Sequence, residues 1–415
     1  MQSPGRQMRI AVVVLGDLGR SPRMQYQALA LADAGAAVEL VGYCEHPVYP
    51  QVRARSDIRV HCLAGTGHGQ SRGRGYLASS ILRTIRQHLQ LLRTLMIRLP
   101  PCDAILVQNP PSVPTLPVAL LASRLRRARL IVDWHNFGHT ILALKLRPGH
   151  PALRCYRWLE RTFGRRGDGH LCVSHAMRSV LAEQWRVPDA RVLYDRPLQF
   201  DPPVGVTARH EWLDRLEVPP PDRDRTALVV CPTGWTADED ADLLLDAMTT
   251  LDRAIADRPG TRCRIEVIMT GRGPLREAFE RQLAASRPAH VYIHTLWLEH
   301  DAYRGLLRAA DLGICLHRSS SGVDLPMKLA DMNGAGLPAC ALDYGPCLAE
   351  RLHDGENGLL FHSGDELAKR MLELFEEHAP GNPRLARLRE GVRREAGDDW
   401  LRGWQREARD VFGLG

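Results

Sequence analysis

The stretch ADLGICLHRSSSGVDLPMKLADMNGAGLPACALD (Ala310–Asp343) has the pattern of a strand, a loop, a helix and a second strand. Two short apolar runs, ADLGICLH and PACALD, lie on either side of a loop made largely of serines and a glycine. Pro326 begins a helical run after that loop, and a Gly-x-Leu-Pro sequence ends it. This order of elements indicates a β-α-β unit with parallel strands.

Lys328 lies in the first turn of the predicted helix, where the positive end of the helix dipole disfavours a cation. The chain has only two other lysines, Lys145 and Lys369. An anion bound between the ammonium and the free N–H groups of the helix would make this position favourable. Asp331 follows on the same helical face. It either forms a surface ion pair with Lys328, worth roughly a few tenths of a kcal/mol, or is free to bind ribose hydroxyls.

The same alternation of apolar runs and helical segments extends in both directions from this unit. The apolar runs are MRIAVVVLG, AAVELVGY, CDAILVQNPP, ARLIVDWHN and GHLCVSHAM in the first half, and TALVVCPTG, RIEVIMTGRGP, HVYIHTLW and GLLFH in the second. Continuous apolar strands separated by helices are typical of doubly wound parallel sheets. We therefore expect an α/β fold with two Rossmann-like domains.

Composition places the domain boundaries. The Pro-rich, charged stretch 201–224 is the expected linker between an N-terminal domain, 1–200, and a C-terminal domain, 225–382. Residues 383–415 are rich in Arg and Glu and are predicted to form a helical tail that packs back across the domain interface. Ligands of doubly wound sheets bind at the carboxyl ends of the strands, so we expect the site in a cleft where both sheets present those ends.

The chain is moderately basic. It has 415 residues, with 55 Lys and Arg against 48 Asp and Glu, and a formal net charge of +7. Nearly all the basic residues are arginine, a bias that reflects coding as readily as function, so we expect no nucleic-acid partner. The net positive charge is compatible with either of two surfaces: one that contacts anionic lipid, or one that is simply solvated.

The ten cysteines are scattered, and no pair has C-x-x-C spacing. This pattern predicts neither a zinc site nor a disulfide framework, and it favours a reducing, cytoplasmic location. The sequence has no signal peptide and no run of about 18 apolar residues, so any membrane contact is expected to be peripheral. Because no D-x-D ligand pair stands out, and Asp238–Asp240 has the pattern of helix capping, we expect no bound metal and no cofactor.

Several longer motifs resemble a known family. PMKLADMNGAGLP is similar to the P-x-K-x-x-E-x-M-x-x-G-x-P signature of GT-B glycosyltransferases. GDLGRSPRMQYQALALA, LVQNPPSVPTLPVA, LIVDWHNFGHTILAL, HLCVSHAM and WTADEDADLLLDAM resemble one branch, the β-1,4-mannosyltransferases that add the first mannose to chitobiosyl-diphosphodolichol (glycosyltransferase family 33). Eukaryotic members usually carry an N-terminal membrane anchor, whereas this chain starts almost directly at its first strand, so we expect a soluble relative of bacterial type.

The resemblance implies a GT-B fold, GDP-mannose as donor, a lipid-diphosphate-linked glycan as acceptor and inversion at the anomeric carbon. It also implies a nucleotide-sugar site, formed by Gly271, Arg272, Gly273, His317, Ser319, Ser320, Ser321, Gly322, Asp324, Lys328 and Asp331. Related enzymes carry an Arg and a Lys after the first strand of the second domain, but the loop CPTGWTADED has neither. We expect Lys328, Arg272 or Arg318, or backbone groups of 234–236, to take their role of stabilising the negative charge on the leaving nucleotide.

Direct displacement with inversion requires a base that deprotonates the acceptor hydroxyl. The titratable groups at suitable strand ends of the first domain are Asp17, Asp133 and His135, with Asp17 and His135 leading. A structural hydrogen bond is the alternative for each of them. The residues expected to bind the acceptor are Gly16, Gly19, Arg20, Trp134, His139 and His175; for Trp134, burial in the core is the alternative to stacking on a sugar.

The segment ILRTIRQHLQLLRTLMIRL (Ile81–Leu99) interleaves apolar residues with arginines in the pattern of a basic amphipathic helix. It packs its apolar side on the sheet, or it docks on an anionic membrane surface and presents a lipid-linked acceptor to the site. Two further alternatives concern the activity itself. In the first, the protein is a transferase that uses another nucleotide sugar or a soluble acceptor. In the second, it binds sugar nucleotides or glycolipids without catalysis.

Overall fold

The computed structural model describes residues 7–65, 76–236, 238–258, 263–375, 382–395 and 397–414. These residues form two compact units. Unit 1 contains Met1–Tyr194 and Leu401–Gly415, and unit 2 contains Asp195–Trp400. The stretch 201–224, expected to be a linker, thus clusters with unit 2 and contains a helix of ten residues.

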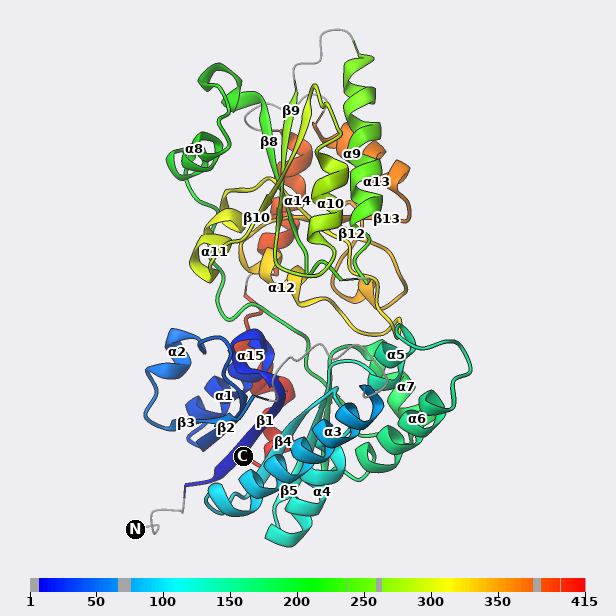
Figure 1. Cartoon of the computed structure of the whole chain (residues 1–415). Coiled ribbons are helices and arrows are strands. Elements are labelled where there is room, and N and C mark those ends of the chain that lie inside the picture. Colours follow the sequence, from blue (N-terminus) through cyan, green and yellow to red (C-terminus); the bar gives the residue numbers. More distant parts are fainter. Residues whose placement is uncertain are drawn as a thin grey trace, which may run out of the picture. The chain divides into compact units, whose positions relative to one another are not determined.

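A parallel sheet of seven strands forms the centre of unit 1, in the order β3-β2-β1-β4-β5-β6-β7 (Figure 1). The strands are β1 (Arg9–Asp17), β2 (Ala37–Tyr43), β3 (Ile58–Leu63), β4 (Ala104–Asn109), β5 (Arg129–Trp134), β6 (Gly169–Cys172) and β7 (Arg191–Val192). Because all neighbouring strands are parallel, their carboxyl ends lie at one edge of the sheet.

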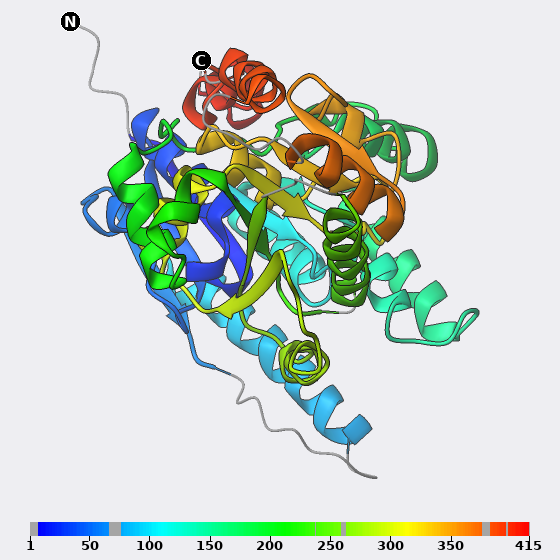
Figure 2. The same cartoon turned by 90° about the horizontal axis from the view of Figure 1, so that it is seen from above.

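Helices accompany these strands, and all but the last lie between them in the sequence. They are α1 (Pro22–Asp33), α2 (Pro50–Arg53), α3 (Tyr76–Arg93), α4 (Thr115–Arg126), α5 (Gly138–Ala143), α6 (Pro151–Gly164), α7 (His175–Trp185) and, at the C-terminus, α15 (Trp400–Glu407). A π-helical turn, Thr94–Arg98, extends α3. Figure 2 shows α3 as a long helix along the outside of unit 1. The side chains of residues 81–83, in the predicted amphipathic segment, lie outside the described residues.

Unit 2 is built on a parallel sheet of six strands in the order β10-β9-β8-β11-β12-β13. The strands are β8 (Thr226–Pro232), β9 (Arg264–Thr270), β10 (Val291–Leu296), β11 (Leu312–Cys315), β12 (Ala339–Leu342) and β13 (Gly358–Phe361). The helices are α8 (Val206–Arg215), α9 (Ala241–Ala256), α10 (Arg276–Leu283), α11 (His300–Ala309), α12 (Met327–Gly334), α13 (Gly364–Phe375) and α14 (Pro383–Arg394).

The apolar runs of the sequence form the interior strands of both sheets. Residues 10–13 of β1 and 227–231 of β8 are completely buried. Strands covered by helices on both faces must be apolar on both, which is why these runs do not alternate with polar residues. The predicted α/β fold with two parallel sheets is confirmed.

One feature of the cysteines was not anticipated. Cys44 and Cys62 form a disulfide, with their Cα atoms 5.6 Å apart. Cys44 follows β2 directly and Cys62 lies on the neighbouring strand β3, opposite Gly42. Strand pairing brings the two thiols together although 18 positions separate them in sequence. The sequence pattern indicated no disulfide framework and gave no sign of this one disulfide.

None of the helices in the described part of the chain combines the length and the apolar character needed to traverse a bilayer. The same part of the chain also contains no group of three or more His, Cys, Asp or Glu side chains arranged to hold a metal ion.

Candidate functional site

Most of the predicted nucleotide-sugar residues follow three adjacent strands of unit 2. β9, β8 and β11 are neighbours in the sheet, and the loops after them carry Gly271–Gly273, Thr233–Asp240 and His317–Asp324. Helix α12, which carries Lys328 and Asp331, begins directly after the last of these loops. Parallel pairing therefore brings together residues that lie up to about a hundred positions apart.

The glycines of the first loop are required by close packing. A Cβ atom at Gly271 would lie 1.7 Å from the carbonyl oxygen of Thr233, and one at Gly273 would lie 2.0 Å from that of Gly234. Real Cβ atoms do not approach backbone this closely, so only glycine fits at either position. The loops after β8 and β9 thus lie backbone against backbone at the edge of the sheet.

Asp324 organises the serine-rich loop from within. Its buried carboxylate accepts hydrogen bonds from the hydroxyls of Ser319 and Ser321, the latter at 3.0 Å. The Ser319 hydroxyl in turn accepts the backbone N–H of Gly322 at 2.8 Å. The N–H groups of Ser321 and Val323 also donate to these hydroxyls, so both serines and the loop backbone are engaged in holding the loop in one conformation. Ser320 lies between them and is half-buried.

His317 is held between two carboxylates. Its Nε2 lies 3.2 Å from Oδ2 of Asp324, and its Nδ1 lies 3.6 Å from Oδ2 of Asp238. Burial opposes the charged form, but the hydrogen bonds and charges of Asp238 and Asp324 outweigh it and raise the pKa of His317 to about 9. The ring is therefore protonated at neutral pH and adds a positive charge to the loop after β11.

Lys328 contacts Glu239. Its ammonium lies against Oε1 of the Glu239 carboxylate, whose Oε2 accepts the hydroxyl of Thr233 at 2.7 Å and the N–H of Gly234. Burial lowers the pKa of Lys328 to about 8, against the opposing charges of Asp238 and Asp331, so the ammonium is still mostly charged at neutral pH. The surface pair of Lys328 with Asp331 that the sequence left open is not formed.

Asp331 lies apart from Lys328 and is half-buried. The Tyr303 hydroxyl donates to its carboxylate at 3.5 Å. Burial raises the pKa of Asp331 to about 7, against the weaker opposing effects of Tyr303, Arg304 and Lys328. Part of the Asp331 population is therefore protonated at neutral pH and able to donate a hydrogen bond.

Arg272 has another partner. Its guanidinium carbon lies 4.0 Å from the centre of the Trp297 ring, and both side chains are exposed. Arg318 is exposed as well, and its backbone N–H donates to the carbonyl of Asp238. Of the three cations considered, Lys328 is the one fixed next to the backbone of the loop after β8.

Sequence reasoning missed Glu239 and interpreted Asp238–Asp240 as helix capping. In the structure these three acidic residues make three different contacts. Asp240 caps α9 by accepting the N–H of Leu243, Asp238 faces His317, and Glu239 holds Lys328. The position of Glu239 in a strand-end loop beside β11 was the available signal, but its partner is 89 residues away.

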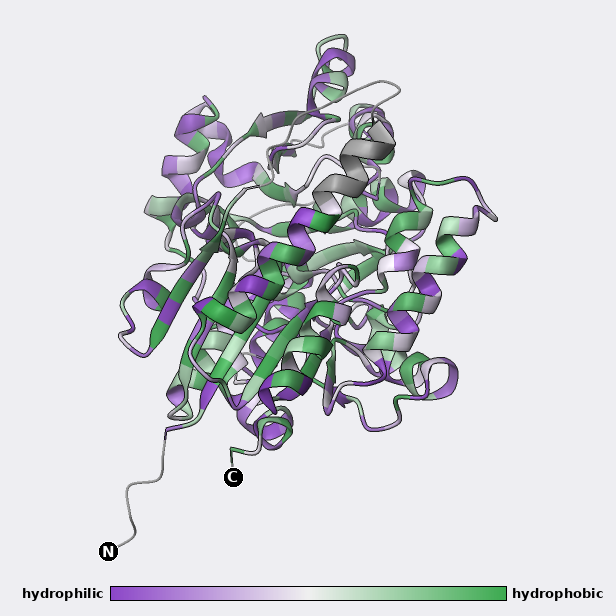
Figure 3. Ribbon diagram, turned by 60° about the horizontal axis from the view of Figure 1, so that its bottom comes forward, coloured by the Kyte–Doolittle hydropathy of each residue, from purple (hydrophilic) through white to green (hydrophobic). Residues whose placement is uncertain are grey.

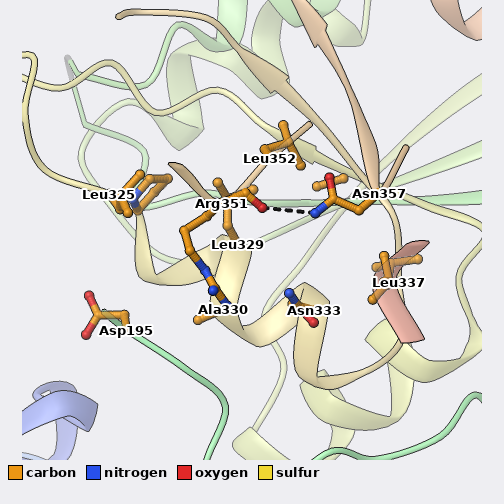
Figure 4. A pocket seen from close by; sticks show the side chains of 12 residues that line it. Asp195, Leu325, Leu329, Ala330, Asn333, Leu337, Arg351, Leu352 and Asn357 are labelled. Atoms are coloured by element: carbon orange, nitrogen blue, oxygen red, sulfur yellow. Dashed lines mark hydrogen bonds between the residues drawn. The ribbon is translucent and has the colours of Figure 1, made fainter. Parts of the chain in front are cut away.

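A separate cavity lies on the other side of α12. Leu329, Ala330 and Asn333 of that helix line it together with Asp195 and Arg351 (Figure 4). Asn357 donates a hydrogen bond to the carbonyl of Arg351 at its wall. None of the predicted nucleotide-sugar residues lines this cavity, so it is distinct from the cluster around Lys328.

In unit 1, Asp17 is the last residue of β1, and both oxygens of its carboxylate contact the neighbouring loop. Its Oδ1 accepts the backbone N–H groups of Glu45 and His46, and its Oδ2 lies 2.7 Å from Nδ1 of His46. Arg20 contacts the other nitrogen of the same ring at 3.2 Å. A Cβ at Gly19 would lie 2.7 Å from that of His46, so this loop passes close to the turn after β1. Gly16 is half-buried at the same strand end.

Asp133 is completely buried at the end of β5. Arg23 of α1 donates two hydrogen bonds to it, at 2.9 and 2.8 Å, and Gln27 donates a third at 3.0 Å. Burial opposes its ionisation most strongly, but the charges of Arg23 and His135 prevail and hold the pKa of Asp133 far below its usual range. Asp133 is therefore a permanent anion and has no access to a substrate.

His135 is the accessible member of this group. Its Nε2 lies 3.2 Å from Oδ2 of Asp133, and one fifth of its side chain is exposed. Its backbone N–H donates to the carbonyl of Asn109, which fixes the chain after β5 to the end of β4. Among the described residues its Nε2 has no hydrogen bond of regular geometry, so its contact with Asp133 is electrostatic.

The predicted acceptor residues have different environments. Trp134 is completely buried and packs on Trp185 and Phe137, so it cannot stack on a sugar; the alternative of a core residue is the one observed. His139 is held by Glu160 at 2.8 Å. His175 is exposed at the start of α7.

Family models match most of the chain. The model of the glycosyl transferase 4-like domain family matches residues 19–194, and that of glycosyl transferases group 1 matches residues 225–377. Among solved structures, a glycosyltransferase from Rickettsia africae aligns with a TM-score of 0.66 at 12% identity, covering 99% of both chains. At this identity the likeness shows the fold, and it confirms the predicted GT-B architecture.

Curated relatives are much more similar in sequence. The UDP-glycosyltransferase TURAN of Arabidopsis thaliana is 39% identical, over 97% of this chain and 96% of its own. The chitobiosyldiphosphodolichol beta-mannosyltransferases of Mus musculus and Homo sapiens are 36% and 35% identical, over 97% and 96% of this chain and 88% and 92% of theirs. The protein therefore belongs to the GT-B glycosyltransferase family of the chitobiosyldiphosphodolichol β-mannosyltransferases.

Proposed function

We propose that this glycosyltransferase is an inverting enzyme that moves mannose from GDP-mannose to a hydroxyl of a lipid-diphosphate-linked oligosaccharide, forming a β-mannosidic bond. The observation that carries the proposal is similarity along nearly the whole length of enzymes named for that reaction. Their names give the acceptor as a chitobiosyl unit on a diphospho-lipid. The geometry of the two sheet edges is consistent with it.

The edge of the unit 2 sheet supports binding of a nucleoside diphosphate. We assign the diphosphate to the ammonium of Lys328 and to the loops after β9 and β11, and the ribose hydroxyls to Asp331. Contact with Glu239 occupies one of the three N–H donors of Lys328 and fixes the side chain, which leaves donors for phosphate oxygens. Fixed positive charge stabilises the negative charge that develops as the bond between the sugar and the diphosphate breaks.

The edge of the unit 1 sheet supports proton transfer. In a direct displacement, the acceptor oxygen forms a bond to the anomeric carbon while the bond to the diphosphate breaks, and the hydroxyl proton must leave. We assign that proton to Nδ1 of His135, whose Nε2 faces Asp133. The buried Asp133 carboxylate orients the ring and stabilises the imidazolium. Asp17 is a weaker candidate because its carboxylate already accepts three N–H groups.

The test is a donor panel with a defined acceptor. The full chain is incubated with GDP-mannose, UDP-glucose or UDP-N-acetylglucosamine and with chitobiosyl diphosphate on a short polyprenol. We expect GDP release that depends on the acceptor, and a product whose new sugar is removed by a β-mannosidase. Release of GDP without acceptor dependence, or a product that resists the β-mannosidase, contradicts the proposal.

A second candidate keeps the fold and the mechanism but uses a UDP-sugar. The 39% identical Arabidopsis relative is named a UDP-glycosyltransferase, which is the observation that favours it. UDP release with the same acceptor, together with no GDP release from GDP-mannose, would select this candidate over the first.

A further inference from the structure

Three helices of unit 1 form one outer layer. α4 packs against α3 on one side and against α6 on the other, and the turn Thr94–Arg98 also packs on α4. The guanidinium of Arg126 on α4 donates to the carbonyls of Met96, Leu99 and Pro100 and fixes that turn. We call the exposed side of residues 84–99, 115–127 and 138–166 the α3–α4–α6 face.

This face is strongly basic. Its three segments contain 13 Lys and Arg residues and one acidic residue, Glu160, which is completely buried. The remainder of the chain keeps 42 of the 55 basic residues against 47 of the 48 acidic ones and is net negative. The positive charge of the protein is thus concentrated on one layer of helices.

Most of these cations are not neutralised. Arg124 pairs with Asp168. Ten others are exposed and form no ion pair with any described residue: Arg86, Arg93, Arg98, Arg127, Lys145, Arg147, Arg154, Arg157, Arg165 and Arg166. An array of unpaired cations on one surface attracts a polyanionic surface.

Large apolar side chains are exposed among the cations. Eleven large hydrophobic residues are exposed in the described part of the chain, and seven of them are on this face. They are Ile85 (49%), Leu89 (63%), Ile97 (74%), Leu121 (48%), Leu125 (62%), Leu144 (58%) and Trp158 (62%). Figure 3 shows the green apolar residues interleaved with purple hydrophilic ones along the described part of α3. Apolar side chains within a field of arginines are typical of surfaces that enter the interface of an anionic bilayer.

We infer that the α3–α4–α6 face is a docking surface for an anionic lipid bilayer. The cations bind the lipid phosphates, while the exposed leucines, isoleucines and Trp158 insert among the acyl chains near the head groups. The inference does not depend on which nucleotide sugar is the donor. Docking through this face would bring unit 1 to the bilayer that holds the lipid-linked acceptor of the proposed function.

A buried hydrogen-bond network around Glu160 connects this face to the candidate site in unit 1. Glu160 of α6 accepts hydrogen bonds from Asn109 and Ser112 after β4, at 3.0 and 2.7 Å, and from the N–H groups of Gly138 and His139. Because these residues lie at the carboxyl edge of the sheet, next to His135, docking would hold that edge at a fixed height above the membrane.

The experiment is co-sedimentation of the full chain with large vesicles of phosphatidylcholine, with and without phosphatidylglycerol, at several salt concentrations. The charge variant carries Arg93→Gln, Arg98→Gln and Arg157→Gln. The matched control removes the same charge from exposed arginines elsewhere, with Arg53→Gln, Arg59→Gln and Arg281→Gln. The apolar variant carries Leu89→Ser, Ile97→Ser and Trp158→Ser. Thermal melts check that each variant folds.

We expect binding to anionic vesicles that weakens with salt, falls at least tenfold in the charge and apolar variants, and is unchanged in the control. Equal binding to neutral vesicles, or a charge variant that binds like the control, overturns the inference. So does a dimer in solution that the apolar variant abolishes, because a second copy would then cover the face. Nucleotide release with a water-soluble acceptor tests the proposed function without membranes, so the two ideas can fail separately.

Discussion

The ammonium of Lys328 lies against the carboxylate of Glu239, although 89 positions separate them in the sequence. This contact joins the first turn of α12 to the loop after β8, whose backbone packs on the glycines after β9. One ion pair thus holds together the loops to which we assign the nucleotide diphosphate. It also accounts for a cation at the start of a helix, since a carboxylate compensates it before any ligand binds.

Replacing Lys328 by alanine should lower the rate of sugar transfer by about 10²- to 10³-fold, because a fixed donor at a developing negative charge is lost. The measurement is acceptor-dependent nucleotide release at saturating donor, with binding of the nucleoside diphosphate followed by calorimetry.

The double variant Lys328→Ala/Glu239→Ala separates catalysis from stability. Removing Glu239 as well should restore part of the stability lost in the single variant, because no unpaired buried carboxylate remains. It should not restore transfer. Recovery of activity in the double variant would show that Lys328 serves only to neutralise Glu239.

Replacing His135 by alanine should reduce turnover by about 10²- to 10⁴-fold with little change in donor binding, as expected for loss of a general base. Replacing Asp17 by asparagine should mainly lower thermal stability, because its carboxylate anchors the loop of His46. Turnover, donor affinity and melting temperature are measured for both variants. A larger loss of turnover in the Asp17 variant would reverse the assignment of the base.

Asp331 makes unit 2 less stable as the pH rises. Its pKa is about 7 when folded and close to 3.8 when unfolded, so the folded state keeps a proton that the unfolded state has lost. Stability from this group is complete below about pH 4 and declines until the pH exceeds 7. Asp331→Asn should therefore melt higher than the unchanged protein at pH 8 and show little gain at pH 4. A shift of about 1 kcal/mol corresponds to roughly 2–4 °C in a unit of this size. An equal gain at both pH values would refute the assigned pKa.

His317 should contribute stability in a different pH range. Its folded pKa of about 9 lies above the ordinary value of 6.5, so its stabilising charge is fully present below pH 6.5 and lost as the pH rises through 9. His317→Gln should lower the melting temperature more at pH 6 than at pH 10. A constant difference across this range would mean that the ring packs as a neutral group between Asp238 and Asp324.

Trp404 connects the C-terminal segment to the core of unit 1. Its Nε1 donates to Oε1 of Gln27 at 2.8 Å, and Gln27 donates to Asp133. Trp404→Phe should cost about 1–3 kcal/mol, because a buried acceptor loses its partner. Trp158→Phe is the control, since Trp158 is 62% exposed and its change should stay within about 0.5 kcal/mol. Chemical unfolding of both variants measures the difference; equal effects would contradict the role given to the hydrogen bond.

The sequence alone determined the architecture and indicated most residues of the proposed nucleotide site. Continuous apolar runs separated by helices can be buried only in parallel sheets covered on both faces, and β1 and β8 show this directly. The positions of Gly271, Gly273 and Lys328 followed from local patterns, because strand ends and helix starts are read from neighbouring residues. The basic amphipathic character of α3 was visible in the same way.

The tertiary structure decided which side chains meet. Lys328 pairs with Glu239 rather than with Asp331, Trp134 is buried rather than exposed to a sugar, and Cys44 is joined to Cys62. Each of these outcomes depends on strand order and register, which place residues far apart in the chain side by side. Local periodicity carries no information about such contacts, because the same strand pattern is compatible with several orders of strands in a sheet.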